Sequence, residues 1–174
     1  MKRVLVTGGA GFIGSHTCAC LLENGYKICV LDSLSHSDKR SLSKIKQILS
    51  GKNINLTDKL NFFKGDLRDK EFIDSVFEKS KNQSKPINGV IHFAGIKSVA
   101  ESVINPLKYW ENNLIGSFNL IKSMSENNCT TIVFSSSATV YGNSSDSLIE
   151  ESSKIKPINP YGSTKYAVEN LLND

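Results

Sequence analysis

The sequence of 174 residues contains no long hydrophobic run, no internal repeat and no low-complexity segment. Its first apolar run, residues 4–6, leads directly into Thr7-Gly8-Gly9. That run is too short for the core of a secretory signal, which needs about 7–15 apolar residues. No segment approaches the roughly 18 apolar residues of a membrane span. We therefore expect a cytoplasmic protein with no membrane partner.

Cysteine pairs with the spacing of zinc ligands are also missing. Cys18, Cys20, Cys29 and Cys129 include no C-x-x-C pair, and His16 and His36 have no partners at metal-ligand spacing. His92 lies in an apolar strand, and we interpret it as a core histidine. Nothing in the sequence indicates an oxidising compartment that would favour disulfides. We predict no metal site, and we interpret the cysteines as small buried apolar side chains.

The excess of positive charge is small and scattered. The chain has 21 basic and 17 acidic residues, for a net charge of +4. Basic residues cluster only within a predicted surface helix near residues 39–49 and a Ser/Asn-rich linker at 79–86. A scattered excess of this kind is typical of a solvated surface, so we predict no nucleic-acid partner.

Short β-branched segments alternate with helical segments along the whole chain. This alternation is typical of a parallel sheet covered by helices. Right-handed crossovers then give an α/β fold, a Rossmann-type doubly wound parallel sheet in one domain over residues 1–174. The chain ends where a sixth strand is expected. Strands are predicted at residues 3–7, 27–31, 60–64, 89–93 and 130–134, and helices at 12–24, 39–49, 70–77, 107–127 and 161–172.

A glycine-rich segment connects the first strand to the first helix. Residues 9–14 (GAGFIG) match G-x-G-x-x-G, and Gly8 adds the related G-x-x-G-x-x-G form. Such glycines permit a tight turn and let a pyrophosphate approach the amides at the start of the helix. The alternative is that they serve only as turn glycines.

Asp32 ends the second predicted strand, 18 residues after Gly14. About 20 residues is the distance expected for the acidic residue that binds the ribose 2′-hydroxyl of NAD. Because a carboxylate repels a 2′-phosphate, NAD is favoured over NADP, although Arg40 keeps NADP open as an alternative. A helix-capping role for Asp32 before Ser33 is the structural alternative.

Tyr161 and Lys165 are four residues apart, and this spacing places them on one face of a helix. A nearby cation favours the phenolate form of a tyrosine, whose pKa is ordinarily about 10. The serines at 135–137 follow the fifth predicted strand. Since ligands bind beyond the carboxyl ends of such strands, a serine hydroxyl and Tyr161 are expected to converge there. A surface Tyr/Lys pair is the alternative.

Four segments together resemble the extended short-chain dehydrogenase/reductase family, and most of all its UDP-glucose 4-epimerases. They are residues 7–14 (TGGAGFIG), 92–97 (HFAGIK), 135–142 (SSSATVYG) and 160–165 (PYGSTK). The resemblance implies NAD as cofactor, a UDP-sugar as substrate and a homodimer in the full-length form. It implies a catalytic triad of Ser137, Tyr161 and Lys165, and substrate contacts from Lys97, Ser137 and Tyr161. It implies NAD contacts from Gly8, Gly11, Phe12, Ile13, Gly14, Asp32, Ser33, Asp66, Leu67, Phe93, Ala94, Gly95, Lys97, Asn112, Tyr161 and Lys165.

The implied reaction interconverts UDP-glucose and UDP-galactose through a 4-keto sugar. Tyr161 takes the proton of the 4-hydroxyl, NAD takes the hydride from C4, and Ser137 relays the proton. Family members are roughly twice as long, so the resemblance implies that the C-terminal substrate lobe is absent and that activity of this chain alone is doubtful. Residues 39–59 look longer than the family's usual stretch, and we interpret them as a surface insertion.

Two rival functions remain. A nucleotide-sugar 4,6-dehydratase resembles the chain through the same nucleotide site, but that group carries an acidic pair where this chain has Ser137-Ala138-Thr139. A catalytically silent NAD-binding module is the second rival. In either case we expect the strand at 130–134 to present an unpaired edge and the chain to self-associate. We also expect the helix at 107–127 and the terminal helix, the latter through Val168, Leu171 and Leu172, to expose apolar stripes.

Overall fold

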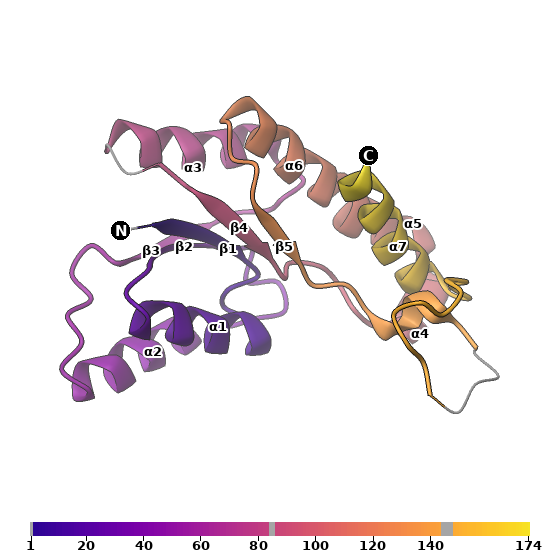
Figure 1. The fold of residues 1–174 in the computed structure, drawn as a ribbon, viewed down its shortest axis with the longest axis horizontal. Coiled ribbons are helices and arrows are strands. Elements are labelled where there is room, and N and C mark those ends of the chain that lie inside the picture. The colour runs from indigo at the N-terminus through magenta and orange to yellow at the C-terminus, as the bar shows by residue number, and fades with distance from the viewer. Residues whose placement is uncertain (1, 84–85, 144–147) are drawn as a thin grey trace.

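A computed structural model describes residues 2–83, 86–143 and 148–174. The described residues form one sheet of five parallel strands in the order β3-β2-β1-β4-β5 (Figure 1). This is the order of a doubly wound Rossmann-type sheet, so the predicted fold class is confirmed. The strands are β1 Arg3–Thr7, β2 Lys27–Asp32, β3 Leu60–Lys64, β4 Gly89–His92 and β5 Ile132–Phe134.

Helices cover both faces of the sheet and also gather beyond one end of it. In Figure 1, α1 and α2 lie on one side of the strands and α3 and α6 on the other, while α4, α5 and α7 lie together beyond the ends of β4 and β5. The helices are α1 Phe12–Glu23, α2 Arg40–Gly51, α3 Lys70–Asn82, α4 Val99–Ile104, α5 Pro106–Tyr109, the π-helix η1 Trp110–Ile115, α6 Gly116–Glu126, the 3₁₀-helix η2 Ala138–Tyr141 and α7 Pro160–Asn173.

Successive residues of the central strand β1 supply two separate cores. Leu5 packs with Ile73 of α3 and other apolar residues on one face, and Val6 packs with Leu22 of α1 and Leu49 of α2 on the other. All these side chains are nearly or completely buried. Burial on both faces is why the strands of a parallel sheet are apolar throughout instead of alternating.

The predicted helix at 107–127 is wrong as a single regular helix. The structure divides this segment into α5, the π-helix η1 and α6. A π-helix has more residues per turn than an α-helix and appears mostly as a local bulge at functional sites. The 3.6-residue period of apolar residues in this segment contains no signal for the bulge.

Other differences are smaller. Helix α3 continues to Asn82, into the predicted linker at 79–86, of which residues 84 and 85 lie outside the described residues. The short helix α4 was not predicted. Cys20 is exposed, contrary to the prediction of four buried cysteines, while burial of Cys18 raises its pKa to about 12.

The terminal helix α7 exposes less apolar surface than expected. Its Val168 is only 1% exposed, so the prediction of an open stripe through that residue is wrong. By contrast, β5 has β4 as its only partner among the described strands, and Val133 is 60% exposed there.

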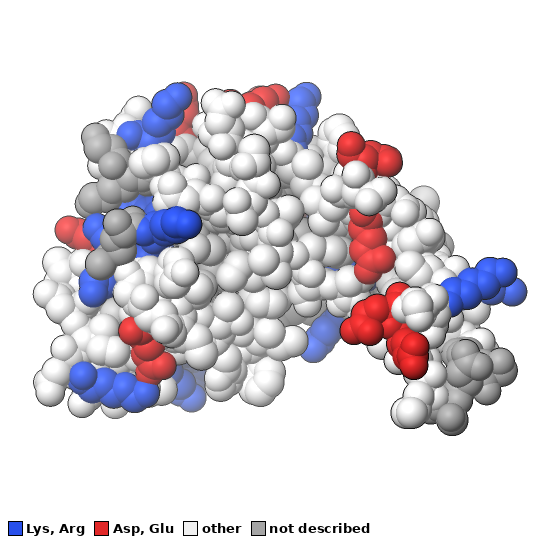
Figure 2. Space-filling model, viewed as in Figure 1, with Lys and Arg blue, Asp and Glu red and all other residues white. Residues whose placement is uncertain are grey.

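On the face drawn in Figure 2, Lys and Arg lie mainly near the rim and the middle is uncharged, while several Asp and Glu side chains follow one another on the right. In the part of the chain that the structure describes, no helix combines the length and the apolar character needed to cross a bilayer. The same residues contain no group of three or more His, Cys, Asp or Glu side chains placed to hold a metal ion.

Candidate active site

The glycine loop after β1 owes its shape to close backbone contacts. Gly8 has φ +67°, and a Cβ on it would lie 2.7 Å from the backbone nitrogen of Ala94. A Cβ on Gly14 would lie 2.3 Å from the carbonyl oxygen of Gly8. Both positions therefore require glycine, which the sequence motif alone left open.

Helix α1 begins directly after this loop, with Gly11 as its N-cap. No described side chain caps the helix, and its first turn holds no acidic residue. Phe12 and Ile13 are 81% and 60% exposed. The first-turn amides therefore have no partner from a capping side chain, and such amides at a helix start attract an anionic group.

Asp32 fastens the end of β2 to the glycine loop. Its Oδ2 accepts a hydrogen bond from the backbone nitrogen of Ala10 at 2.9 Å, and its Oδ1 accepts from the nitrogen of Leu34 at 2.9 Å and the hydroxyl of Ser37 at 2.7 Å. The helix-capping alternative is wrong, because α2 begins only at Arg40. A carboxylate has about four acceptor positions. Three are occupied here, so one remains for a ligand hydroxyl.

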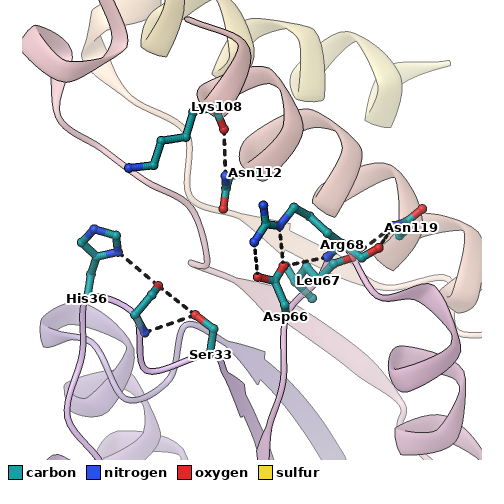
Figure 3. A network of polar contacts seen from close by, with 9 residues as sticks. Ser33, His36, Asp66, Leu67, Arg68, Lys108, Asn112 and Asn119 are labelled. Carbon is teal, nitrogen blue, oxygen red and sulfur yellow. Dashed lines mark hydrogen bonds and ion pairs between the residues drawn. The ribbon is translucent and has the colours of Figure 1, made fainter. Parts of the chain in front are cut away.

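Asp66, after β3, is held by a two-pronged contact with Arg68 (Figure 3). Its Oδ1 and Oδ2 accept from Arg68 Nε at 3.0 Å and Nη2 at 2.8 Å. The hydrogen bonds from Arg68 hold the pKa of Asp66 below its ordinary value. Asn119 of α6 donates to the carbonyl oxygens of Leu67 and Arg68, at 3.2 and 3.0 Å. The bonds from Asn119 fix the loop after β3, and the contact with Arg68 keeps Asp66 ionised, so that its oxygens can accept hydrogen bonds.

Figure 3 also shows how Asn112 and Ser33 lie relative to Asp66. Asn112 belongs to η1, and its side chain donates to the carbonyl oxygen of Lys108 at 2.8 Å. Ser33 lies on the loop after β2, where its hydroxyl is 2.9 Å from that of Ser35. Three separate segments thus present polar side chains to the same region.

Asn113, which the sequence did not single out, fastens the loop after β4 to α7. Its Oδ1 accepts from the nitrogen of Ile96 at 2.9 Å, and its Nδ2 donates to the carbonyl oxygen of Ile96 at 3.0 Å and to Thr164 Oγ1 at 3.1 Å. The side chain is 3% exposed. The signal available in the sequence was a second asparagine beside Asn112 in a partly apolar helix.

His92 is a buried structural histidine. Its Nδ1 is 2.6 Å from Thr7 Oγ1 and its Nε2 is 2.8 Å from Ser117 Oγ. Burial, with a smaller contribution from the charge of Lys165, lowers its pKa to about 3. The imidazole is therefore neutral at physiological pH.

The segments that carry Ser137 and Tyr161 lie against each other. A Cβ on Gly162 would be 2.7 Å from the carbonyl oxygen of Thr139, so the start of α7 packs directly on η2. Ser137 Oγ accepts from Thr139 Oγ1 at 2.9 Å. The ring of Tyr161 meets the ring of buried Tyr109 edge-on, with centroids 6.3 Å apart.

Lys165, one turn after Tyr161, points back to the end of β5. Its Nζ donates to the carbonyl oxygen of Ser135 at 2.9 Å and lies 4.7 Å from the centroid of the Phe134 ring. Burial lowers its pKa to about 8. Ser136 Oγ is buried without a hydrogen-bond partner among the described residues, an arrangement that native structures rarely leave unexplained.

The predicted site residues lie at the end of the sheet where the carboxyl ends of its parallel strands meet. The glycine loop, Asp32, Asp66 and the loops after β4 and β5 all follow the carboxyl ends of strands, and η1 and α7 pack beside them. A Cβ on Gly95 would lie 3.8 Å from Lys165 Nζ, which brings the loop after β4 against the Tyr/Lys helix. Lys97 is exposed at the rim of this arrangement.

The sequence profile of the family described as GDP-mannose 4,6 dehydratase matches residues 5–174. The chain belongs to this family. Among curated members it is 50% identical over 171 residues to the UDP-glucose 4-epimerase of Bacillus subtilis, covering 98% of this chain and 47% of that protein. The family resemblance inferred from the four motifs is confirmed.

Solved structures of the family superpose closely on the chain. The UDP-glucose 4-epimerase of Bifidobacterium longum in complex with NAD⁺ and UDP gives a TM-score of 0.89 at 39% identity, covering 99% of this chain and 48% of that one. The enzyme from Stenotrophomonas maltophila, with bound NAD and formylated UDP-arabinopyranose, gives 0.88 at 38% identity, covering 100% and 48%. The chain spans about half the length of the relatives it matches.

Proposed function

We propose that this chain forms the NAD-binding and proton-transfer part of a UDP-hexose 4-epimerase that interconverts UDP-glucose and UDP-galactose. The observation that carries the proposal is the close approach of three segments. The glycine loop contacts the loop after β4 at Gly8 and Ala94, and that loop contacts α7 at Gly95 and Lys165. An anion-binding helix start is thus connected to a buried Tyr/Lys pair. Solved relatives that contain NAD support the same assignment.

The residues present fit NAD. The uncapped first turn of α1 suits the pyrophosphate, the one free acceptor position of Asp32 suits a ribose hydroxyl, and Asp66 supplies an ionised acceptor beside Leu67. When bound, NAD would supply a reversible acceptor for the hydride of sugar carbon 4. Lys165 would hold hydroxyls of the second ribose.

The proton step belongs to the side chains of α7 and the loop after β5. Tyr161 as phenolate removes the proton from the sugar 4-hydroxyl, and the ammonium of Lys165 favours that phenolate. Ser137 hydrogen-bonds the same sugar oxygen and passes the proton to Tyr161. Lys97, at the rim, meets the substrate. When the 4-keto sugar has turned over, so that C4 regains its hydrogen on the other face, Tyr161 returns the proton to the same oxygen.

The segment after Ser137 favours epimerisation over dehydration, although the family takes its description from a dehydratase. Eliminating water needs an acid or base beside the oxidised sugar. Here Ser137 is followed by Ala138 and by Thr139, whose hydroxyl donates back to Ser137 at 2.9 Å. No carboxylate stands in this position.

A binding experiment on the chain itself tests the cofactor. We expect NAD to bind more tightly than NADP in calorimetric titration, and Asp32→Ala to narrow the difference. Glu78→Ala, which removes an exposed carboxylate on α3, is the matched control and should leave the difference unchanged. Equal affinities of the unmodified chain for the two dinucleotides would contradict the proposal.

A second experiment tests the chemistry, because the chain matches only half of its relatives. The chain should be joined to the part of the Bacillus subtilis enzyme that it does not match, and the chimera assayed with UDP-galactose. Tyr161→Phe should lower turnover by about 10²–10⁴-fold and leave NAD bound. Tyr166→Phe, on the same helix, is the control. A Tyr161→Phe chimera with near-normal turnover would remove Tyr161 from the mechanism.

We also propose a homodimer for the full-length form.

The alternative of a catalytically silent NAD-binding module predicts that the chimera binds NAD without turnover. The chimera assay therefore separates this alternative from the epimerase.

A further inference from the structure

The ammonium of Lys165 is buried without an ion-pair partner among the described residues. The residue is 5% exposed. Glu169, one turn further along α7, raises its pKa, but burial outweighs that effect and the pKa falls to about 8. The other titratable groups around it are Tyr161 on its own helix and neutral His92 on β4. A buried amine in such surroundings tends to lose its proton.

Two groups at the end of β5 oppose this loss. The carbonyl oxygen of Ser135 accepts a hydrogen bond from Lys165 Nζ at 2.9 Å, and the ring of Phe134 lies under the same nitrogen at 4.7 Å from its centroid. The face of an aromatic ring attracts a cation within about 6 Å, and more strongly where water is excluded. Both contacts stabilise the charged amine more than the neutral one.

The ring of Phe134 is itself held in place. Its centroid is 5.5 Å from that of His92, with the two planes inclined by 33°. His92 is fixed by Thr7 and Ser117 through both ring nitrogens. Because His92 is neutral, it leaves the ammonium of Lys165 as the cation nearest to the Phe134 ring among the described contacts.

We propose that Phe134 is a positioning residue for Lys165, and that its ring keeps the Lys165 amine charged and directed to the end of β5. The proposal rests on the proposed function in one respect only, namely that a charged Lys165 is what makes Tyr161 a base. The aromatic residue before the serine segment then contributes to the chemistry without touching substrate or cofactor.

The margin for this charge is small. Burial lowers the pKa of Lys165 to about 8, so its titration range lies close to neutral pH. A contact of this kind in a desolvated position changes a protonation constant by about 3- to 30-fold. Loss of the ring should therefore shift the Lys165 amine toward its uncharged form near neutral pH.

The test is a pH titration of Lys165 in the chain without cofactor. The Cε signal of ¹³C-labelled lysine is followed by NMR and assigned by its disappearance in Lys165→Arg. Phe134→Leu, which keeps apolar bulk but removes the ring face, should lower the protonation constant by about 3- to 30-fold. Phe134→Tyr, which restores the face, should return it to the original value.

Phe62→Leu is the matched control. Phe62 lies under the Nζ of Lys39 at 5.3 Å from its centroid, in β3 of the same sheet. This substitution removes an equal ring and should leave Lys165 unchanged. If Phe134→Leu does not fold, Phe134→Trp decides, because the stronger indole face should raise the constant.

An unchanged protonation constant in Phe134→Leu, or in Phe134→Trp where that variant decides, overturns the proposal. So does a decrease of the same size in the Phe62→Leu control. Failure of the proposed function is a separate result, since absence of NAD binding or of chimera turnover does not alter the amine titration.

Discussion

The two halves of the candidate site are built by different means. Around the glycine loop, backbone packs on backbone, and the missing Cβ atoms of Gly8 and Gly14 set the geometry. Around α7, buried polar side chains set the geometry. Asn113 and His92 form hydrogen bonds through every polar atom of their side chains. A backbone-built site depends on residues of one type at fixed spacing. A side-chain-built site depends on partners far apart in the sequence.

The largest expected effect tests the backbone-built half. In Gly14→Ala the new Cβ would lie 2.3 Å from the Gly8 carbonyl oxygen and 2.8 Å from Gly9 Cα. Both neighbours are backbone and cannot rotate away, so we expect a loss of about 3 kcal/mol in the free energy of unfolding and loss of NAD binding. Urea denaturation and calorimetry measure the two effects.

Gly51→Ala is the control for that experiment. No described atom lies within 4 Å of its added Cβ, and the residue ends α2. We expect an unchanged or slightly higher stability, because alanine favours a helix. Equal losses in both variants would show that the effect of Gly14→Ala does not come from the backbone contact.

Asn113→Ala tests the side-chain-built half. It leaves the amide and carbonyl of Ile96 and the hydroxyl of Thr164 without their partner in a buried position. We expect a loss of about 2 kcal/mol, measured by urea denaturation. Asn112→Ala removes one bond to its own helix and should cost clearly less. If the two variants lose equal stability, Asn113 is not the fastening residue.

The pH dependence of the free energy of unfolding also tests the side-chain-built half, through the buried His92. The pKa of His92 is lowered from 6.5 to about 3, so between these pH values the unfolded chain binds the proton and the folded chain does not. Stability is therefore full above about pH 6.5 and decreases as the pH falls.

Between pH 7 and pH 5.5 we expect a loss of about 1 kcal/mol from this residue. His92→Gln should show a flatter profile over the same interval. A profile of unchanged slope in that variant would assign the dependence to other groups.

The smallest expected effect lies at an exposed ion pair beside the backbone-built half. Arg40 pairs with Asp38 at 2.7 Å, but both side chains are largely exposed. Exposed pairs contribute little because water and salt screen them. Arg40→Ala should leave the midpoint of urea denaturation unchanged. A measurable shift of that midpoint would show that the ion pair with Asp38 stabilises the fold.

The same contrast explains what the sequence predicts and what it does not. The glycine spacing and the position of Asp32 are local patterns, and the strand, turn and helix that they predict are present in the structure. Their role in binding NAD stays a prediction. Asn113 acts through Ile96 and Thr164, which are 17 and 51 residues away. The contact of the Phe134 ring with a cation likewise depends on Lys165, which is distant in the sequence, so no local pattern predicts it.

The bulge at η1 has a consequence for how mutations accumulate in this chain. One residue in an α-helix corresponds to a rotation of about 100°, so the wider turn sets the angular phase between two helical segments. Before and within it, Tyr109 and Asn113 face the site, and after it Leu120 and Met124 face the core. Deleting any single residue from 110–115 would leave one segment rotated out of contact. Length here is as constrained as identity, and we expect insertions and deletions to be tolerated in loops but not in this helix.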